Sequence, residues 1–224
     1  AIMSGAVSKE RIAKIWQSTK KHLLKPLNSF CLNTEFNQPY LDFGRLFGFA
    51  YGEKENGAVF SHMVVMFAYS LYKQGFVKEG FFTLNSLFAL ATEESAQIPP
   101  TLPEYFNHQG RGLYLYLTGS ASWYIYTLTE QVLGIGFESA SLVLTPKLIK
   151  ENFCQDTISV DMDINKKQFK IVYVKTKDSS ETFRILKAEC NGTNILTSPT
   201  QCRLSKQLLN AQEQKNNTIK VFLG

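Results

Sequence analysis

The sequence predicts an α+β protein whose helices come first and whose strands come last. Up to residue 133, apolar residues recur at helical spacing, whereas after Ile135 they alternate with polar residues at every second position. Runs of helices followed by runs of strands favour separate packed layers over an interleaved α/β sheet. We therefore predict a helical domain over residues 1–145 and a small antiparallel β-sandwich over residues 146–224.

The composition is that of a folded protein. The chain has 224 residues, of which 44% are hydrophobic and 19% charged, which suffices for one large core or two domains. The net charge of +5 comes from scattered Lys and Arg, without the one-sided basic stripe that favours nucleic-acid binding. No apolar run approaches the roughly 20 residues of a membrane span, and no charged-then-apolar leader opens the chain. We expect no nucleic-acid partner, no membrane segment and a cytoplasmic location.

The four cysteines do not indicate a metal or redox site, because none of them forms a C-x-x-C spacing. Free thiols in a reducing compartment are the main expectation. The alternative is that Cys190 and Cys202 pair across a hairpin. We expect no metal.

Four helices are predicted before residue 135. Ser8 is suited to cap a helix that ends near Leu24. The next two helices are apolar on almost every side, which predicts that they are buried. The last three helices are expected at residues 61–74, 78–92 and 118–133. Two irregular stretches, residues 28–52 and 98–112, separate helices, and loops this long are often functional.

The period-two segments begin at Ile158. Ile158, Val160 and Met162 form the apolar face of the first strand, which places Asp161 and Asp163 on the opposite, solvent-facing side. Two neighbouring carboxylates resemble a catalytic pair, but their place in this alternation predicts ordinary exposed residues.

The first polar cluster is the string EKENGAVFSHM, which leads into the second helix. It gathers Lys54, Glu55, Asn56, Gly57 and His62 on an element otherwise built for burial. Burying a polar group without a partner costs roughly 2–7 kcal/mol. The cluster is therefore either a hydrogen-bonded network at the helix entry or the lining of a polar ligand site.

The second cluster is the string YLTGSASW, at the start of the fourth helix. Thr118 is a plausible N-cap, and small residues from Gly119 onward leave the terminal N–H groups approachable. Free N–H donors and the partial positive charge of a helix N-terminus make a ready anion site. Ordinary capping without a ligand is the alternative.

The strings KENGAVFSHM and YLTGSASW, followed by LVLTPKL, resemble the C-terminal part of glycoside hydrolase family 94. The family includes inverting phosphorylases such as cellobiose and chitobiose phosphorylase, and the phosphorylase-like region of cyclic β-1,2-glucan synthases. The resemblance covers roughly residues 1–150. It implies the C-terminal part of an (α/α)6 barrel, closed by a small β-sandwich.

The resemblance also implies the chemistry. Phosphate, rather than water, attacks the anomeric carbon of a β-glucoside while an aspartic acid protonates the leaving oxygen, and the product is an α-sugar 1-phosphate. His62, Thr118 and Gly119 are implied to bind phosphate. Lys54 and Glu55 are implied to bind the sugar next to the cleaved bond. The partners would be a β-linked oligosaccharide or glucan and inorganic phosphate, with no cofactor.

The chain departs from the family pattern in two ways. The general acid lies upstream in the family and nothing here matches it, so we expect a fragment that is inactive alone, with apolar helices that favour a homodimer. A family glutamine in the loop before the second cluster has no clear match, and Gln109, Asn107 and Glu104 are candidates. The alternatives are a fragment of an (α/α)6 hydrolase that uses water, of a cyclic glucan synthase, or a non-catalytic carbohydrate-binding or assembly module.

Overall fold

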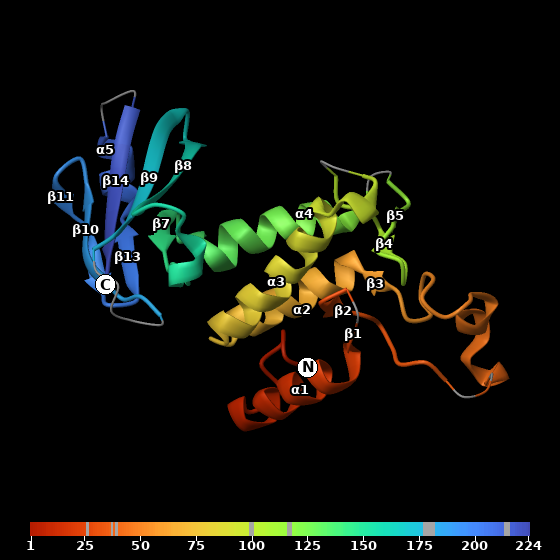
Figure 1. Ribbon diagram of the computed structural model, residues 1–224. Coiled ribbons are helices and arrows are strands. Elements are labelled where there is room, and N and C mark those ends of the chain that lie inside the picture. Colours follow the sequence, from red (N-terminus) through yellow and green to blue (C-terminus); the bar gives the residue numbers. More distant parts are fainter. Residues whose placement is uncertain are drawn as a thin grey trace. The chain divides into compact units, whose positions relative to one another are not determined.

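A computed structural model describes residues 1–25, 27–36, 38, 40–98, 101–115, 118–176, 182–212 and 216–224. The chain forms two compact units, Ala1–Thr127 and Leu128–Gly224. The first unit holds the long helices and the second holds the two larger sheets (Figure 1). This division falls earlier than the predicted boundary at residue 145, because residues 135–138 pair with residues 141–144, which in turn pair with residues 202–204 of the second unit.

The helices of the first unit follow the predicted spacing closely. They are α1 (Lys9–Leu23), α2 (Ser61–Lys73), α3 (Val77–Thr92) and α4 (Gly119–Tyr126), with short 3-10 turns η1 (Leu41–Gly48) and η2 (Glu94–Ala96). Ser8 caps α1 as predicted, since its hydroxyl accepts from the Arg11 N–H at 3.3 Å. Gly75 ends α2 in the left-handed region (φ 84°), as a C-terminal glycine should.

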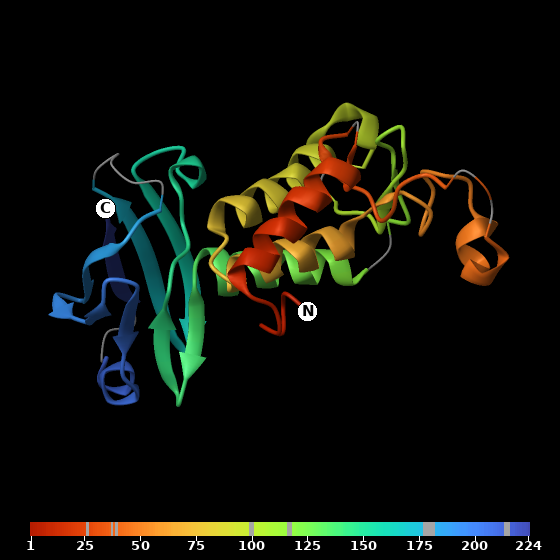
Figure 2. The ribbon, with the colours of Figure 1, turned by 90° about the horizontal axis from the view of Figure 1, so that it is seen from below.

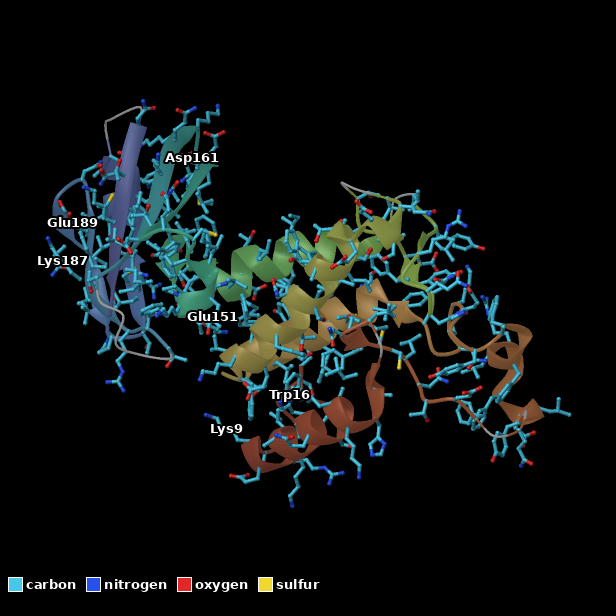
Figure 3. All side chains as sticks on the ribbon, in the orientation of Figure 1. Lys9, Trp16, Glu151, Asp161, Lys187 and Glu189 are labelled. Atoms are coloured by element: carbon cyan, nitrogen blue, oxygen red, sulfur yellow. The ribbon has the colours of Figure 1, made fainter. Side chains whose placement is uncertain are left out.

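An aromatic cluster packs α1 against the next two helices. Trp16 lies on the side of α1 that faces α2 and α3 (Figure 3) and meets Phe30, Phe67 and Phe82 at centroid distances of 5.7–6.2 Å. Figure 2 shows α1 alongside α2 and α3. Inside this group Ile12, Leu71 and Leu87 are fully buried. Such burial supplies most of the driving force for this unit.

The irregular stretches hold short strands that the sequence did not predict. A two-stranded sheet pairs β1 (Leu24–Lys25) with β2 (Ser29–Phe30), and a three-stranded sheet joins β3 (Val59–Phe60), β4 (Tyr105–Phe106) and β5 (Gly112–Leu113). The three-stranded sheet matters for the site, because it ties the start of α2 to residues 104–113. The predicted fourth helix, residues 118–133, divides into α4 and a π-helical turn, η3 (Thr127–Val132).

The second unit contains two sheets. A five-stranded sheet has the order β11-β10-β14-β9-β8, and a four-stranded sheet has the order β12-β13-β7-β6. The strands are β6 (Ile135–Glu138), β7 (Ser141–Leu144), β8 (Thr157–Ile164), β9 (Lys167–Lys175), β10 (Ile185–Cys190), β11 (Thr193–Asn194), β12 (Leu196–Ser198), β13 (Gln201–Leu204) and β14 (Asn216–Leu223), with the short helices η4 (Lys150–Asn152) and α5 (Lys206–Ala211).

The predicted antiparallel arrangement needs one correction. β14 pairs with β9 in parallel, from Asn216 opposite Gln168 to Leu223 opposite Lys175. Alternation along a strand identifies its buried face but not its direction, so this pair was not visible in the sequence. Asp161 and Asp163 are exposed on β8, as predicted.

The four cysteines are free thiols, which was the main expectation, and the alternative pairing of Cys190 with Cys202 is wrong. Cys190 and Cys202 are both buried. Cys190 lies on β10 of the five-stranded sheet and Cys202 on β13 of the four-stranded sheet, so no single hairpin joins them. Burial raises the pKa of the Cys190 thiol to about 11 and that of Cys202 to about 12.

Candidate functional site

The beginning of the first polar cluster forms a tight turn over residues 52–57. The Asn56 N–H donates to the Glu53 carbonyl at 3.0 Å, and the Gly52 N–H donates to the Asn56 carbonyl at 2.6 Å. Gly52, Lys54 and Gly57 all have positive φ, at 89°, 45° and 81°. Glycine adopts that conformation freely but lysine does not. The turn therefore presents Lys54 at some conformational cost, and surrounding contacts must hold it.

Lys54 lies between aromatic rings and one carboxylate. Its Nζ is 3.5 Å from the ring centroid of Tyr114, 5.9 Å from that of Tyr105 and 4.0 Å from Oε1 of Glu104. A lysine on an aromatic face is attracted by the ring quadrupole while its N–H donors stay available to a ligand. This environment suits a cation that donates to sugar hydroxyls.

Glu55 has one partnered oxygen and one that lacks a partner. Its Oε1 lies 3.0 Å from Nη2 of Arg45, in a pair exposed enough to contribute little stability. Its Oε2 is buried and has no hydrogen-bond partner among the described residues. A buried carboxylate oxygen without a donor is costly, and a ligand hydroxyl would satisfy it.

Asn56 and Gly57 shape the turn. The Asn56 amide donates to the Phe49 carbonyl at 2.9 Å and accepts from the Asn33 side chain at 3.2 Å. The Gly57 N–H donates to Oδ1 of Asn33 at 2.9 Å. These bonds fasten residues 49–57 to Asn33, so this part of the cluster is a satisfied network.

His62 meets the second cluster directly. A methyl group built on Gly119 would stand only 3.0 Å from Cε1 and 3.3 Å from Nδ1 of the His62 ring. The same ring lies 5.9 Å, centroid to centroid, from that of Trp123. Its Nε2 is buried and has no hydrogen-bond partner in the described part of the chain. The structure thus brings two predicted residues, far apart in sequence, into contact, and leaves one ring nitrogen for a ligand.

Thr118 caps α4 as predicted. Its Oγ1 accepts from the Ser120 N–H at 3.3 Å and shares a second, short hydrogen bond with the Ser120 hydroxyl. The Ser120 hydroxyl also reaches the Pro103 carbonyl at 3.4 Å. Gly119 therefore opens α4 next to His62, where the N–H groups of the first turn are concentrated. Tyr116 and Leu117 of the quoted string lie outside the described residues.

Glu104 joins the two ends of the first cluster. Its carbonyl accepts from the Ser61 N–H at 3.0 Å, at the start of α2, and its N–H donates to the Tyr114 carbonyl at 3.0 Å. Its carboxylate faces Lys54. One residue thus touches the element that carries His62 and the side chain of Lys54. Three residues were candidates to match the glutamine that the family has in this loop, and of these Glu104 is the one in contact with both Ser61 and Lys54.

The other two candidates are placed differently. The Asn107 carbonyl oxygen Oδ1 accepts from the N–H groups of Gln109 and Arg111 at 3.0 and 3.1 Å, and its Nδ2 donates to Oε1 of Glu53 at 3.2 Å. Asn107 is buried, whereas Gln109 is exposed in the turn that Asn107 organises. Both belong to the frame around the site.

Sequence reasoning missed several contacting residues. Tyr105 and Tyr114 flank Glu104 beside Lys54, and Trp123 packs on His62. Glu53 accepts from the Tyr105 hydroxyl at 3.2 Å as well as from Asn107. Glu53 is the first residue of the first cluster, so the sequence showed a charged residue there. The strand that brings Tyr105 to it has only two residues, too few for a periodic pattern.

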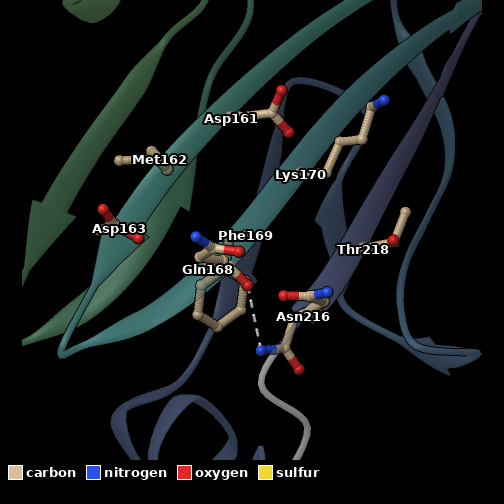
Figure 4. A pocket seen from close by; sticks show the side chains of 9 residues that line it. Asp161, Met162, Asp163, Gln168, Phe169, Lys170, Asn216 and Thr218 are labelled. Carbon is tan, nitrogen blue, oxygen red and sulfur yellow. Dashed lines mark hydrogen bonds between the residues drawn. The ribbon is translucent and has the colours of Figure 1, made fainter.

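Two hollows in the surface are alternative candidate sites. One of about 190 Å³ lies behind the turn, lined in part by Gly52, Gly57 and His108, and is smaller than typical ligand pockets. The other, about 470 Å³, belongs to the second unit and lies over β8, β9 and β14 (Figure 4). Its exposed side chains are polar, and Phe169 in its lining is only 1% exposed.

Among the described residues, no group of three or more His, Cys, Asp or Glu side chains is placed to hold a metal ion. A membrane-spanning helix, which has to be both long and apolar, is not found in the same part of the chain.

Comparison with known proteins identifies the family of the chain. Residues 1–134 match the family described as "Glycosyl hydrolase 94 superfamily, catalytic domain". The chain is 29% identical over 161 residues to cellobionic acid phosphorylase of Neurospora crassa, covering 66% of this chain and 20% of that protein. It is also 29% identical over 153 residues to N,N'-diacetylchitobiose phosphorylase of Vibrio furnissii, covering 63% of this chain and 19% of that protein. The chain spans about a fifth of the length of these relatives. The match over more than half of the chain, which includes both polar clusters, shows that it belongs to the glycosyl hydrolase 94 superfamily.

Proposed function

We propose that this chain is the C-terminal portion of an inverting phosphorylase, which uses inorganic phosphate to cleave a β-linked glucoside and releases an α-sugar 1-phosphate. The observation that carries the proposal is the contact between His62 and Gly119, with Nε2 of His62 buried and without a partner. An imidazole beside a helix N-terminus is a suitable environment for an anion. The phosphorylases of Neurospora crassa and Vibrio furnissii align over 66% and 63% of this chain.

In this proposal, the phosphate lies at the start of α4. Nε2 of His62 and the N–H of Gly119 donate to phosphate oxygens, and the Thr118 hydroxyl adds a third polar contact. The partial positive charge of the helix end favours the anion by roughly 0.3–1 kcal/mol, and more where the site is partly buried. The same donors would hold phosphate in position as it attacks the anomeric carbon.

The sugar lies toward Lys54 and Glu55. Lys54 donates to sugar hydroxyls from the face of Tyr114, and Oε2 of Glu55 accepts from another hydroxyl. The general acid and the remaining contacts come from the rest of the protein, so the isolated chain should not turn over substrate. Inorganic phosphate serves as co-substrate, without metal or cofactor. The two relatives are named for different substrates, so we propose a substrate class rather than one sugar. The class is β-linked disaccharides and glucans. A cyclic β-1,2-glucan synthase as the whole protein is the alternative.

The wider architecture is part of the proposal. Helices α1–α4 of the unit Ala1–Thr127 would belong to an (α/α)6 barrel, and the unit Leu128–Gly224 would be the small β-domain. An apolar hollow of about 380 Å³ is lined in part by the exposed side chains of Phe88 on α3 and Ile125 on α4. This surface supports the proposal that further barrel helices pack against α3 and α4 in the whole protein. A cytoplasmic location fits the free cysteines. Association into a homodimer is tested by the mass of the whole protein in solution.

Two other functions are less well supported. An (α/α)6 hydrolase that uses water would leave the buried Nε2 of His62 without a role. A carbohydrate-binding module would be expected to expose an aromatic ring in a groove of the β-unit. The hollow over β8, β9 and β14 has polar walls, and its aromatic residue, Phe169, is buried.

The substitution His62→Ala in the whole protein tests the proposal. We expect the KM for phosphate to rise at least tenfold, because a hydrogen bond to a charged ligand contributes about 1.5–3 kcal/mol. The unfolding midpoint should change far less. His22→Ala, at an exposed histidine in the last turn of α1, is the matched control. Unchanged phosphate dependence, or a wholly unfolded variant, would remove His62 from the phosphate site.

A further inference from the structure

We propose that Glu53 is a positioning residue, whose carboxylate fixes the turn of residues 52–57 so that Lys54 meets the sugar in the correct place. The inference rests on the proposed function, since it assigns Lys54 to the sugar. It gives a role to a residue that lies beside the predicted site but does not itself belong to the set of ligand-binding side chains.

The Glu53 carboxylate holds two donors from the same segment. Oε2 accepts from the Tyr105 hydroxyl and Oε1 from Nδ2 of Asn107, both at 3.2 Å. Tyr105 lies on β4 and Asn107 directly follows that strand. Hydrogen bonds to a charged group are shorter and stronger than those between neutral groups. The carboxylate therefore clamps the turn to the end of β4.

The turn needs such a clamp. Lys54 is a non-glycine residue with φ 45°, between Gly52 and Gly57, which also have positive φ. A non-glycine residue in the left-handed region costs of order 1–2 kcal/mol and persists only when its surroundings determine the conformation. Backbone bonds within the turn close it, Asn33 holds Asn56 and Gly57, and the pairing of β3 with β4 holds the chain that follows. The Glu53 contacts add a second link to β4, at the residue directly before Lys54.

Tyr105 connects the clamp to Lys54. Its hydroxyl is bound to Glu53, while its ring lies 5.9 Å from the Lys54 ammonium and 5.9 Å from the ring of Tyr114. Burial, reinforced by the charge of Glu53, raises the pKa of Tyr105, so its hydroxyl remains a donor throughout the working pH range. Its buried ring also stacks on that of Phe60, two residues before His62.

The residue directly before β4 carries a partner of Lys54. This residue is Glu104, and its carboxylate lies 4.0 Å from the Lys54 ammonium. Two of the three groups around the ammonium, the Glu104 carboxylate and the Tyr105 ring, thus come from adjacent residues of the segment that Glu53 holds to the turn. Loss of the clamp should move Lys54 relative to Glu104 without removing either group.

Tyr105→Phe is the sharpest test, because it removes the hydroxyl that Glu53 binds and leaves the ring beside Lys54 in place. In the whole protein we expect the KM for the sugar to rise about tenfold, equivalent to about 1.4 kcal/mol, and the KM for phosphate to stay within about twofold of the original value. Glu53→Gln should act in the same direction, and the double variant should show less than the sum of the two effects. Tyr40→Phe is the matched control, because it makes the same change in an exposed tyrosine that is 65 residues from Tyr105 in the sequence.

A second measurement separates this inference from the proposed function. Hydrogen exchange should become faster at the amides of Gly52 and Asn56 in Tyr105→Phe and Glu53→Gln, but not in Tyr40→Phe, whatever reaction the protein catalyses. Unchanged exchange at these amides, or equal rises in both KM values, would overturn the positioning role. Faster exchange in a protein without phosphate-dependent activity would keep the clamp and reject the proposed function.

Discussion

The substitution Gly119→Ala separates phosphate binding from folding, because it adds one methyl group where α4 meets His62. That methyl carbon would lie 3.0 Å from Cε1 of the His62 ring. Ordinary carbon contacts are about 3.5–4.0 Å, so the ring has to retreat by roughly 0.5 Å. Trp123 lies against the same ring and restricts that movement.

The expected effect on phosphate is large. Productive geometry is held to within about 0.5 Å in sites of this kind, and a 1 Å misplacement costs about a hundredfold. We expect the KM for phosphate to rise about ten- to hundredfold, while the KM for the sugar changes little because Lys54 and Glu55 are untouched.

The expected effect on stability is small. Gly119 does not have positive φ, so alanine fits the backbone there. Replacing glycine in a compatible conformation stabilises by about 0.4–1 kcal/mol, and a side chain forced off its rotamer costs about 0.5–1.5 kcal/mol. The net change in the free energy of unfolding should therefore stay within about 1 kcal/mol.

The assay is steady-state release of sugar 1-phosphate by the whole protein at varied phosphate and fixed sugar, alongside denaturant unfolding. Gly48→Ala is the matched control, because nothing lies within 4 Å of a methyl group at that position and its φ is not positive. A Gly119→Ala protein with an unchanged KM for phosphate would refute the contact between His62 and Gly119 as the phosphate site. Equal rises in both KM values would point to a general loss of structure instead.

Four further predictions concern the ligand, the thiols and the packing. Phosphate at about 100 times its Kd should stabilise the whole protein by about 2.7 kcal/mol in a thermal or denaturant unfolding assay, and His62→Ala should abolish most of that gain; equal stabilisation of both proteins would contradict the site. Iodoacetamide at pH 8 should label the exposed Cys154 and spare the buried Cys190 and Cys202 in the folded protein, as peptide mass spectrometry can show. Since burial raises the pKa values of Cys190 and Cys202 from 9.0 to about 11 and 12, unfolding lets both thiols ionise more readily, and the free energy of unfolding should fall as pH rises from about 9 toward 12; a rise over that window would contradict their burial. Tyr173→Phe removes a hydroxyl donor from the partly buried backbone carbonyl of Leu133 and should cost about 0.5–1.5 kcal/mol on chemical denaturation, and no loss would show that the carbonyl finds another donor.

The sequence predicted those parts of the fold that local chemistry determines. Ser8 and Thr118 were expected as N-caps and both accept the hydrogen bonds of caps. Gly75 was expected to end the second helix and does so with positive φ. The spacing of apolar residues located α1, α2 and α3 to within a residue or two. Each of these signals lies within one turn of chain.

Features that depend on distant partners were not predicted. β3, β4 and β5 are two residues each, too short for a periodic pattern, yet they bring Glu104 and Tyr105 to the turn of residues 52–57. The parallel pairing of β14 with β9 and the separation of Cys190 from Cys202 depend on strand order, which alternation does not encode.

The candidate site divides along the same line. The start of α4 alone suggested an anion site, the family resemblance added His62, and their contact through Gly119 emerges only in the folded chain. The resemblance also placed Lys54 and Glu55 near a sugar, but the aromatic face of Tyr114 and the contacts of Glu53 were not expected. The motifs indicated which residues to consider, whereas the supporting contacts required the structure.

The most direct test follows the products made by the whole protein that carries this chain. A panel of β-linked disaccharides and glucans is incubated with and without inorganic phosphate, and sugar 1-phosphate and free sugar are measured separately. The proposal predicts phosphate-dependent release of an α-sugar 1-phosphate from at least one member of the panel. Phosphate-independent release of free sugar would make the protein a hydrolase and contradict the roles of His62, Thr118 and Gly119.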